Sequence, residues 1–109
     1  MSPPQLQNTE QLEAALRAPR FLLFKHSLIC PTSTRAFGEY EAFMRAHPDI
    51  PTGWIDVIGQ RPWSQDVAAR TGVTHQSPQA LWLVDGAVAW HASHFDITRD
   101  RLAEACLPR

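Results

Sequence analysis

The sequence predicts an α/β fold: a single domain with a four-stranded mixed sheet flanked by helices. The chain has 109 residues, 44% of them apolar, which suits one hydrophobic core and leaves little room for a second. Its apolar periodicities follow the order α-β-α-β-α-β-β-α. A strand-helix-strand unit makes parallel strands and a tight hairpin makes antiparallel ones, so the sheet is expected to be mixed. We expect the domain to span residues 1–109, with residues 1–7 and 107–109 frayed.

The first elements are a short helix and a core strand. Asn8, followed three residues later by Gln11, is typical of a helix start, and an apolar stripe continues until Pro19. The stripe consists of Leu12, Ala15 and Leu16. Residues 21–24 form a continuous apolar run of strand length. Such a run predicts a central strand that is covered on both faces.

A longer helix and a second strand complete a βαβ unit. Phe37, Tyr40 and Met44 recur at helical spacing until His47-Pro48 ends the pattern. Residues 53–58 read as a strand. Because a helix joins this strand to the first one, the two strands are predicted to be parallel with a right-handed crossover.

The remaining elements are a helix, a hairpin and a final helix. Pro62 suits the first turn of a helix, and Gly72 suits the position just after its end. Residues 79–84 and 87–91 are two strand-like runs, and Asp85-Gly86 between them is a two-residue hairpin signal. These strands are therefore predicted to be antiparallel. The last helix is expected from about Thr98 to Cys106.

Composition and charge argue against several classes of partner. The formal net charge is −1 and acidic and basic residues are interspersed, so we expect neither nucleic acid nor membrane as a partner. The N-terminus lacks the pattern of a secretory signal, and no apolar stretch approaches the length that a bilayer needs. Two cysteines are too few for a disulfide scaffold. We expect a cytoplasmic protein with free thiols, and a monomer.

Cys30 is the predicted catalytic residue. It lies between a strand and a helix, where unpaired N–H groups and the positive end of the helix dipole favour a thiolate. Pro31 suits the first helical turn, and Ser33 can donate a hydrogen bond to the thiolate but cannot displace a mixed disulfide as a second cysteine would. The pattern predicts a monothiol site. The alternative is that Cys30 is a small buried hydrophobic residue.

Besides Pro31 and Ser33, four further residues are candidates for binding substrate near Cys30. Lys25 and His26 end the first strand, where a cation could lower the thiol pKa or hold a substrate carboxylate; a solvated strand-end charge and an ordinary packing histidine are the alternatives. Pro78 directly precedes a strand and is a candidate cis-proline, which would leave the backbone of Ser77 free to pair with substrate. The alternative for Pro78 is an ordinary trans proline.

Cys106 and the histidines carry weaker signals. Cys106 shares the apolar face of the last predicted helix with Leu102, which favours a core residue, with a resolving thiol as the alternative. His75, His91 and His94 are scattered and have no cysteine or carboxylate pattern beside them. We therefore expect no metal site and no bound cofactor.

Several segments together resemble the monothiol bacilliredoxins. The resemblance covers nearly the whole chain after residue 20 and is strongest in the KHSxxCPxS and HxSPQA segments; the matching runs are Phe24-Lys25-His26-Ser27, Cys30-Pro31-Thr32-Ser33, Asp56-Val57-Ile58, Arg61-Pro62, Thr71-Gly72-Val73, His75 to Ala80 and Trp90 to His94. It implies a thioredoxin-like fold in a bacterial protein. It also implies that the protein reduces mixed disulfides between client proteins and bacillithiol, a low-molecular-weight thiol that replaces glutathione in some bacteria.

The resemblance assigns roles to individual residues. Cys30 would be the attacking thiol and Pro78 the cis-proline opposite it, with Lys25, Ser33 and Ser77 around them. Bacillithiol would be a co-substrate, and the partners would be bacillithiolated proteins. Cys106 has no place in the shared pattern.

Two other functions remain open at this stage. One is binding and transfer of an iron–sulfur cluster, as in glutaredoxin-like monothiol proteins. Those proteins share a Cys-Gly-Phe-Ser site, whereas this chain has Pro31 and Thr32 in the middle positions, which argues against it. The other is a redox-inert adaptor with the same fold, in which Cys30 is structural.

Overall fold

The structure, a computed structural model, describes residues 3–107 and has the predicted α/β architecture. Helices and strands follow one another in the predicted order, with one added 3₁₀ turn, η1. The elements are α1 (Thr9–Arg17), β1 (Arg20–His26), α2 (Pro31–Ala46), β2 (Thr52–Asp56), α3 (Arg61–Thr71), β3 (Gln79–Val84), β4 (Ala87–Ser93), η1 (His94–Asp96) and α4 (Arg99–Cys106).

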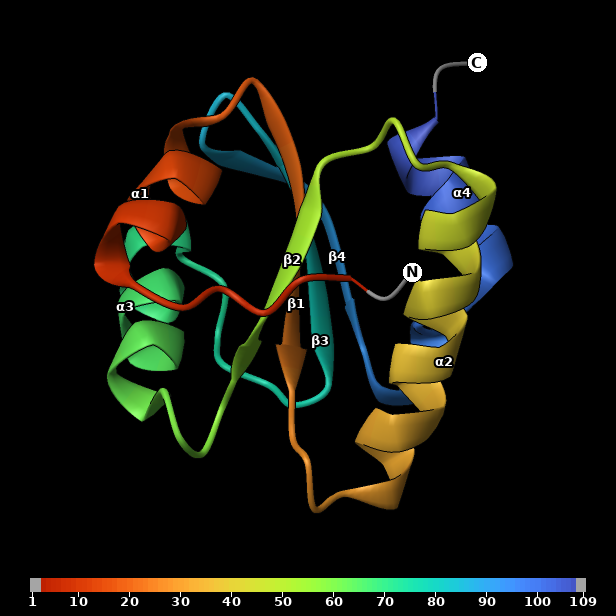
Figure 1. The fold of residues 1–109 in the computed structure, drawn as a ribbon, viewed down its shortest axis with the longest axis horizontal. Helices are drawn as coiled ribbons and strands as arrows, with labels where there is room; N and C mark the ends of the chain where they lie inside the picture. Colours follow the sequence, from red (N-terminus) through yellow and green to blue (C-terminus); the bar gives the residue numbers. More distant parts are fainter. Residues whose placement is uncertain (1–2, 108–109) are drawn as a thin grey trace.

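The four strands form one mixed sheet in the order β2-β1-β3-β4. β1 is parallel to β2, and β3 is antiparallel to both β1 and β4. As a result β1, β2 and β4 all end at one edge of the sheet, and β3 begins there. We call this the carboxyl edge; it is at the bottom of Figure 1. The mixed topology confirms the prediction.

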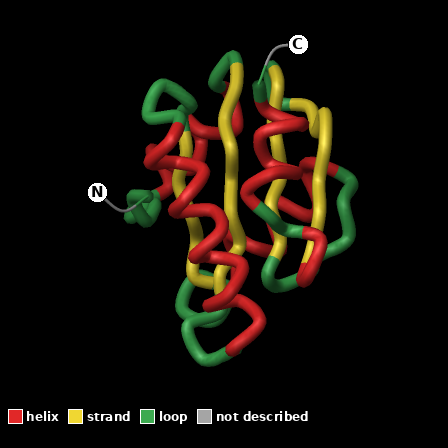
Figure 2. Tube along the Cα trace, turned by 90° about the vertical axis from the view of Figure 1, so that its right-hand side faces the viewer, coloured by secondary structure: helices red, strands yellow, loops and turns green. Residues whose placement is uncertain are grey.

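Helices cover both faces of the sheet. α1 and α3 lie on one face and α2 and α4 on the other (Figure 1), and Figure 2 looks onto the second layer with the strands behind it. Side chains of β1 alternate between two cores, with Leu22 and Phe24 on the α2/α4 side and Leu23 on the α1/α3 side. This explains the continuous apolar run of β1, because each of its faces is buried.

Local signals in the sequence explain where elements begin and end. The Asn8 side chain caps α1 by accepting a hydrogen bond of 2.8 Å from the Gln11 N–H. Gly72 follows α3 with a φ of +75°. Asp85 and Gly86 have φ values of +51° and +82°, as a tight hairpin turn between β3 and β4 requires.

The expectation of frayed ends is wrong where the structure describes them. Leu6 is buried, its N–H donates to the Trp54 carbonyl at 2.9 Å, and Gln5 forms a parallel bridge to Trp54. β2 has an open outer edge, so a short segment gains backbone hydrogen bonds there while it buries Leu6. At the other end, the Leu107 N–H donates to the Ala103 carbonyl at 3.1 Å. Residues 1–2 and 108–109 lie outside the described residues.

The helices within residues 3–107 are all too short or too polar to cross a membrane.

Candidate functional site

Cys30 lies at the carboxyl edge, immediately before α2. It is the N-cap residue of this helix, with an extended backbone (φ −107°, ψ 118°), and Pro31 occupies the first helical position. The Cys30 thiol is free and half-buried. Acidic side chains are absent from the first turn of α2, so nothing in that turn opposes negative charge on the sulfur. The structure therefore places Cys30 at the N-terminal end of α2, with its side chain partly accessible.

Ser33 holds the first turn of α2 against the end of β1. Its side chain is fully buried, and its Oγ accepts a hydrogen bond of 2.9 Å from the Ser27 N–H. The same oxygen lies 2.7 Å from His26 Nδ1. The sequence suggested a hydrogen bond from Ser33 to the thiolate, but the hydroxyl is engaged by the strand end instead. Ser33 is thus a positioning residue for the loop that carries Cys30.

His26 is a packing residue as well as the partner of Ser33. Its ring stacks on Phe37 with a centroid separation of 4.4 Å and meets Trp54 edge-on at 5.2 Å. Burial lowers the pKa of His26, which favours the neutral ring. The prediction that His26 binds substrate is not met by this geometry, because aromatic side chains and Ser33 enclose the imidazole.

The Lys25 side chain lies on the other face of the sheet from His26, beside α3, and is fully buried. Its Nζ donates to the Ser64 carbonyl at 3.1 Å and lies 3.2 Å from His75 Nδ1. Burial lowers the pKa of Lys25 to about 8. Neither a cation that holds a substrate carboxylate nor the alternative of a solvated strand-end charge fits this geometry, because Lys25 is enclosed between the sheet and α3.

Three buried side-chain polar atoms lie at or near the carboxyl edge without a hydrogen-bond partner among the described residues: the Ser64 hydroxyl, the Ser77 hydroxyl and Gln79 Oε1. Gln79 pairs with Lys25 across β1 and β3, which places their side chains on the same face of the sheet. The sequence suggested His75 only as a candidate metal ligand, and no local pattern signals its contact with Lys25, which is 50 residues away in the chain.

The Ser77–Pro78 peptide bond is cis, as the resemblance implied. Pro78 is buried directly before β3, and its carbonyl accepts a hydrogen bond of 3.1 Å from the His94 N–H. Because β3 begins at the carboxyl edge, the structure brings Pro78 to the same edge as Cys30.

Cys106 belongs to the core between α2 and α4. It is buried, and burial raises the pKa of its thiol to about 12. Cys106 is the last residue of α4, which ends far from the start of α2 in Figure 1. Cys106 and Tyr40 belong to the same core cluster, and Tyr40 lies about 15 Å along α2 from Cys30 at 1.5 Å per residue. A disulfide needs Cα atoms within about 7 Å, so the core interpretation holds and a resolving role for Cys106 does not.

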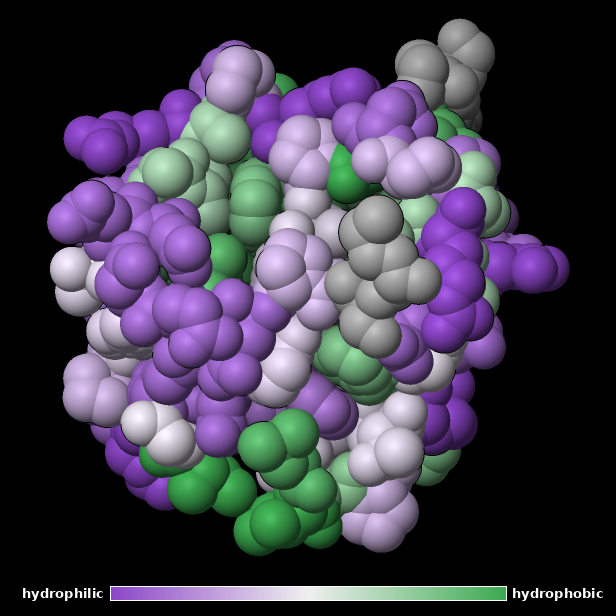
Figure 3. Space-filling model, viewed as in Figure 1, coloured by the Kyte–Doolittle hydropathy of each residue, from purple (hydrophilic) through white to green (hydrophobic). Residues whose placement is uncertain are grey.

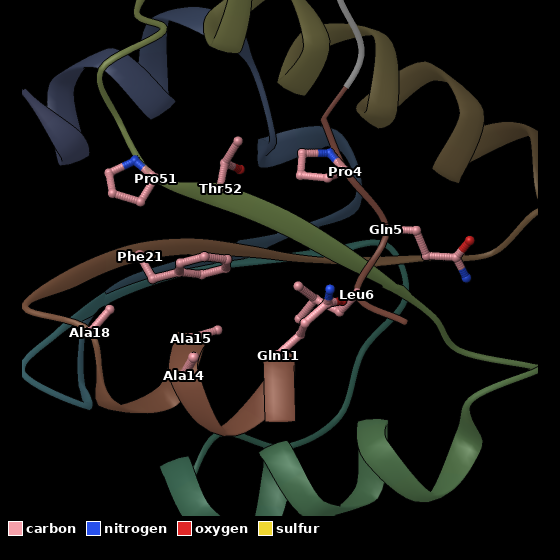
Figure 4. Close-up of a pocket in the computed structure, with 10 residues that line it drawn as sticks. All are labelled: Pro4, Gln5, Leu6, Gln11, Ala14, Ala15, Ala18, Phe21, Pro51 and Thr52. Carbon is pink, nitrogen blue, oxygen red and sulfur yellow. The ribbon is translucent and has the colours of Figure 1, made fainter. Parts of the chain in front are cut away.

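Two larger cavities lie away from the thiol. One, of about 430 Å³, is an apolar pocket between the N-terminal segment, α1 and β2, with Leu6, Ala15 and Phe21 in its wall (Figure 4). The other, of about 390 Å³, lies between the α3–β3 loop and β4 and includes Gln79 and His91. Neither wall contains Cys30, so the candidate site is an open surface at the carboxyl edge.

Comparisons with known proteins identify the family and the fold of the chain. The family model described as "Monothiol bacilliredoxin BrxC" matches residues 4–102. A solved protein described as a candidate oxidoreductase with a thioredoxin fold is 31% identical, with 94% of this chain and 91% of that chain covered and a TM-score of 0.86. Mitochondrial thioredoxin 3 of Saccharomyces cerevisiae is 16% identical, with 95% and 92% covered and a TM-score of 0.71. Desulfothioredoxin of Desulfovibrio vulgaris Hildenborough is 18% identical, with 96% of each chain covered and a TM-score of 0.71.

The two thioredoxins are distant and show the fold alone, whereas the family model spans nearly the whole described chain. The chain therefore belongs to the monothiol bacilliredoxin BrxC family, with a thioredoxin fold and a thiol redox role.

Proposed function

We propose that the protein reduces mixed disulfides between client proteins and bacillithiol through Cys30. The observation that carries this proposal is the pairing of a half-exposed Cys30 at the start of α2 with a fully buried Ser33 three residues later. One accessible thiol can accept a small thiol group, and with no second thiol nearby it keeps that group until another molecule removes it.

The reaction proceeds as two thiol–disulfide exchanges. The Cys30 thiolate attacks the bacillithiol sulfur of the mixed disulfide; a new S–S bond forms, and the client cysteine leaves as a thiolate that takes a proton from water. A second low-molecular-weight thiol, as its thiolate, then attacks the bacillithiol sulfur on Cys30. This second exchange releases a small disulfide and returns the Cys30 thiolate, so electrons balance without a bound cofactor.

The surrounding residues favour the first exchange by position. Ser33, His26 and the Ser27 N–H hold the first turn of α2 against the end of β1, so the loop that carries Cys30 is anchored on both sides. The Ser77–Pro78 segment borders the same edge and offers backbone groups to an extended substrate. We propose that the protein acts as a monomer in the cytoplasm.

Intact-mass spectrometry tests the proposal directly. Reduced protein is mixed with a bacillithiolated client, and wild type is compared with Cys30→Ser. We expect wild type to gain one bacillithiol group while the client loses it, and Cys30→Ser to leave the client unchanged. Transfer by Cys30→Ser, or reaction of wild type with glutathionylated clients only, would contradict the proposal.

A further inference from the structure

Lys25 is a fully buried lysine on a side of the molecule whose outer surface is hydrophilic. At the lower left of Figure 3, where α3 lies, the exposed side chains are mainly hydrophilic, whereas Lys25 is enclosed between α3 and the sheet. Taking an ammonium group out of water is unfavourable unless hydrogen bonds replace its hydration. An apolar side chain of similar length would fill the same space without this cost, so the burial of the amine needs a reason other than packing.

The Lys25 amine contacts two segments that follow one another in the chain. Nζ donates to the Ser64 carbonyl, in the first turn of α3, at 3.1 Å and lies 3.2 Å from His75 Nδ1. His75 belongs to the α3–β3 loop, residues 72–78, which runs from the end of α3 to the carboxyl edge (Figure 1). The same loop contains the Ser77–Pro78 segment. One side chain of β1 therefore holds both the start of α3 and the loop that follows this helix.

The middle of the α3–β3 loop is held by side chains rather than by backbone pairing. Among the described residues, residues 73–77 take part in no backbone–backbone hydrogen bond. Two side chains of the sheet reach this stretch: Lys25 contacts His75, and Gln79 Nε2 donates to the Thr74 carbonyl at 3.1 Å. A segment without backbone partners opens readily unless other contacts fix it. The position of the loop therefore depends on these side-chain contacts.

Neighbouring residues of β1 support the two halves of the candidate site. Successive side chains of a strand point to opposite faces of the sheet. On one face, His26 Nδ1 lies 2.7 Å from Ser33 Oγ and supports the turn that follows Cys30. On the other face, Lys25 contacts His75 in the α3–β3 loop. The thiol and the loop are thus held independently, each from its own face of the sheet.

We propose that Lys25 is a positioning residue that holds the α3–β3 loop where the Ser77 backbone binds substrate. This inference rests on the proposed function, in which the Ser77–Pro78 segment pairs with the extended part of the mixed disulfide. Because Lys25 is fully buried, it acts on the substrate only through its hydrogen bond to His75. Loss of this bond displaces the loop and weakens substrate binding. The intrinsic reactivity of Cys30, which is held from the other face, stays unchanged.

The test measures substrate binding and thiol reactivity separately. The substrate is a nine-residue peptide whose central cysteine carries bacillithiol, and the second readout is the rate at which iodoacetamide alkylates Cys30. In Lys25→Met and in His75→Ala we expect KM to rise about tenfold, with kcat within about twofold of wild type, because a displaced loop no longer meets the substrate correctly. Alkylation of Cys30 should keep its wild-type rate in both variants.

Three further variants identify the contact. The double variant Lys25→Met/His75→Ala should raise KM about tenfold, as each single variant does, since both changes remove one shared hydrogen bond. His75→Asn should stay within about threefold of wild type, because its side-chain oxygen can accept from Lys25 in place of Nδ1. Arg61→Gln is the control: it removes the other positive charge that acts on His75, and KM should not change.

The possible outcomes are distinguishable. An unchanged KM in Lys25→Met and His75→Ala overturns the proposal, as does a rise of about a hundredfold in the double variant, which would show independent effects. An equal rise in Arg61→Gln would indicate a general effect of charge and also overturns it. Slower alkylation of Cys30 in the Lys25 and His75 variants has the same consequence, because these changes would then disturb the whole site.

A failure of the proposed function can be told apart from a failure of this inference. If wild type reduces a glutathionylated peptide but not the bacillithiolated one, the proposed function fails, and KM for the glutathionylated peptide tests Lys25 in the same way. If Lys25→Met loses its thermal unfolding transition, His75→Ala and His75→Asn decide. A tenfold rise of KM in His75→Ala that His75→Asn restores then supports the proposal, and equal values of KM in the two variants overturn it.

Discussion

Lys25 and His75 lie 3.2 Å apart, Nζ to Nδ1, although both groups can carry positive charge. An ammonium can only donate, so His75 Nδ1 accepts and the proton of its neutral ring is on Nε2. Burial, followed by the charges of Lys25 and Arg61, lowers the pKa of His75. The described salt bridges include none to Lys25, so the buried amine depends on neutral acceptors. Because of this arrangement, the stability of the folded protein depends on the protonation of Lys25 at alkaline pH.

We predict that Lys25 makes the folded state more stable as pH rises from about 8 to 10.5. Its pKa is about 8 in the folded protein against an ordinary value of 10.5, so in this window the unfolded chain binds more protons. The buried Cys106 and Tyr40, whose pKa values are raised, act in the opposite direction at high pH. The measurement is therefore the difference in urea unfolding free energy between wild type and Lys25→Met at several pH values. A difference that does not change with pH would contradict the prediction.

We predict that Ser33→Ala destabilises the protein by about 1–3 kcal/mol, because the buried Ser27 N–H loses its acceptor. The rate of exchange at Cys30 should fall in the same variant, since the loop is less firmly held. Thr34→Ala is the control: Thr34 is exposed, and within residues 3–107 its hydroxyl donates only to the Cys30 carbonyl, at 3.3 Å. Urea unfolding and single-turnover kinetics measure both effects, and equal losses in the two variants would count against the role of Ser33.

We predict that the two thiols differ in reactivity in the folded protein. Iodoacetamide should add one group to native wild type, none to native Cys30→Ser, and two to wild type unfolded in urea. The reason is that Cys106 is buried and its thiol pKa is raised to about 12, whereas Cys30 is half-buried at the surface. Intact mass after a short labelling pulse gives the count. A second adduct on native wild type would show that α4 opens readily.

We predict opposite effects of alanine at two glycines. Gly86 has a φ of +82°, and an added Cβ would lie 2.9 Å from the Leu16 carbonyl oxygen, so Gly86→Ala should destabilise the protein by about 1–2 kcal/mol or more. Gly38 lies inside α2 with open space around it, so Gly38→Ala should stabilise the protein by roughly 0.5–1 kcal/mol. Thermal unfolding shows whether each variant is more or less stable than wild type. A change in the same direction in both variants would refute the prediction.

Short-range patterns were sufficient for most of the fold and for the position of Cys30. Asn8 and Asp85-Gly86 act on their immediate neighbours, so their consequences can be predicted from sequence. The directions of long polar side chains could not be predicted, because they depend on packing between distant segments. Lys25 meets Ser64 on α3 only after the sheet forms, and Phe95 meets Arg35 across about 60 residues of chain.

The expectation of frayed N-terminal residues failed for a similar reason. Fraying is a local tendency of chain ends, whereas the pairing of Gln5 and Leu6 depends on the open outer edge of β2. The partner atom is on Trp54, which only the assembled sheet provides.

The burial of Cys106 limits how oxidation can link molecules to one another. Covalent chains of proteins grow only when each member offers two accessible sulfurs, and a folded molecule with Cys106 enclosed offers one. Intermolecular oxidation of the folded protein therefore ends at pairs joined through Cys30. A thiol that attacks the disulfide between the two Cys30 residues separates such a pair again.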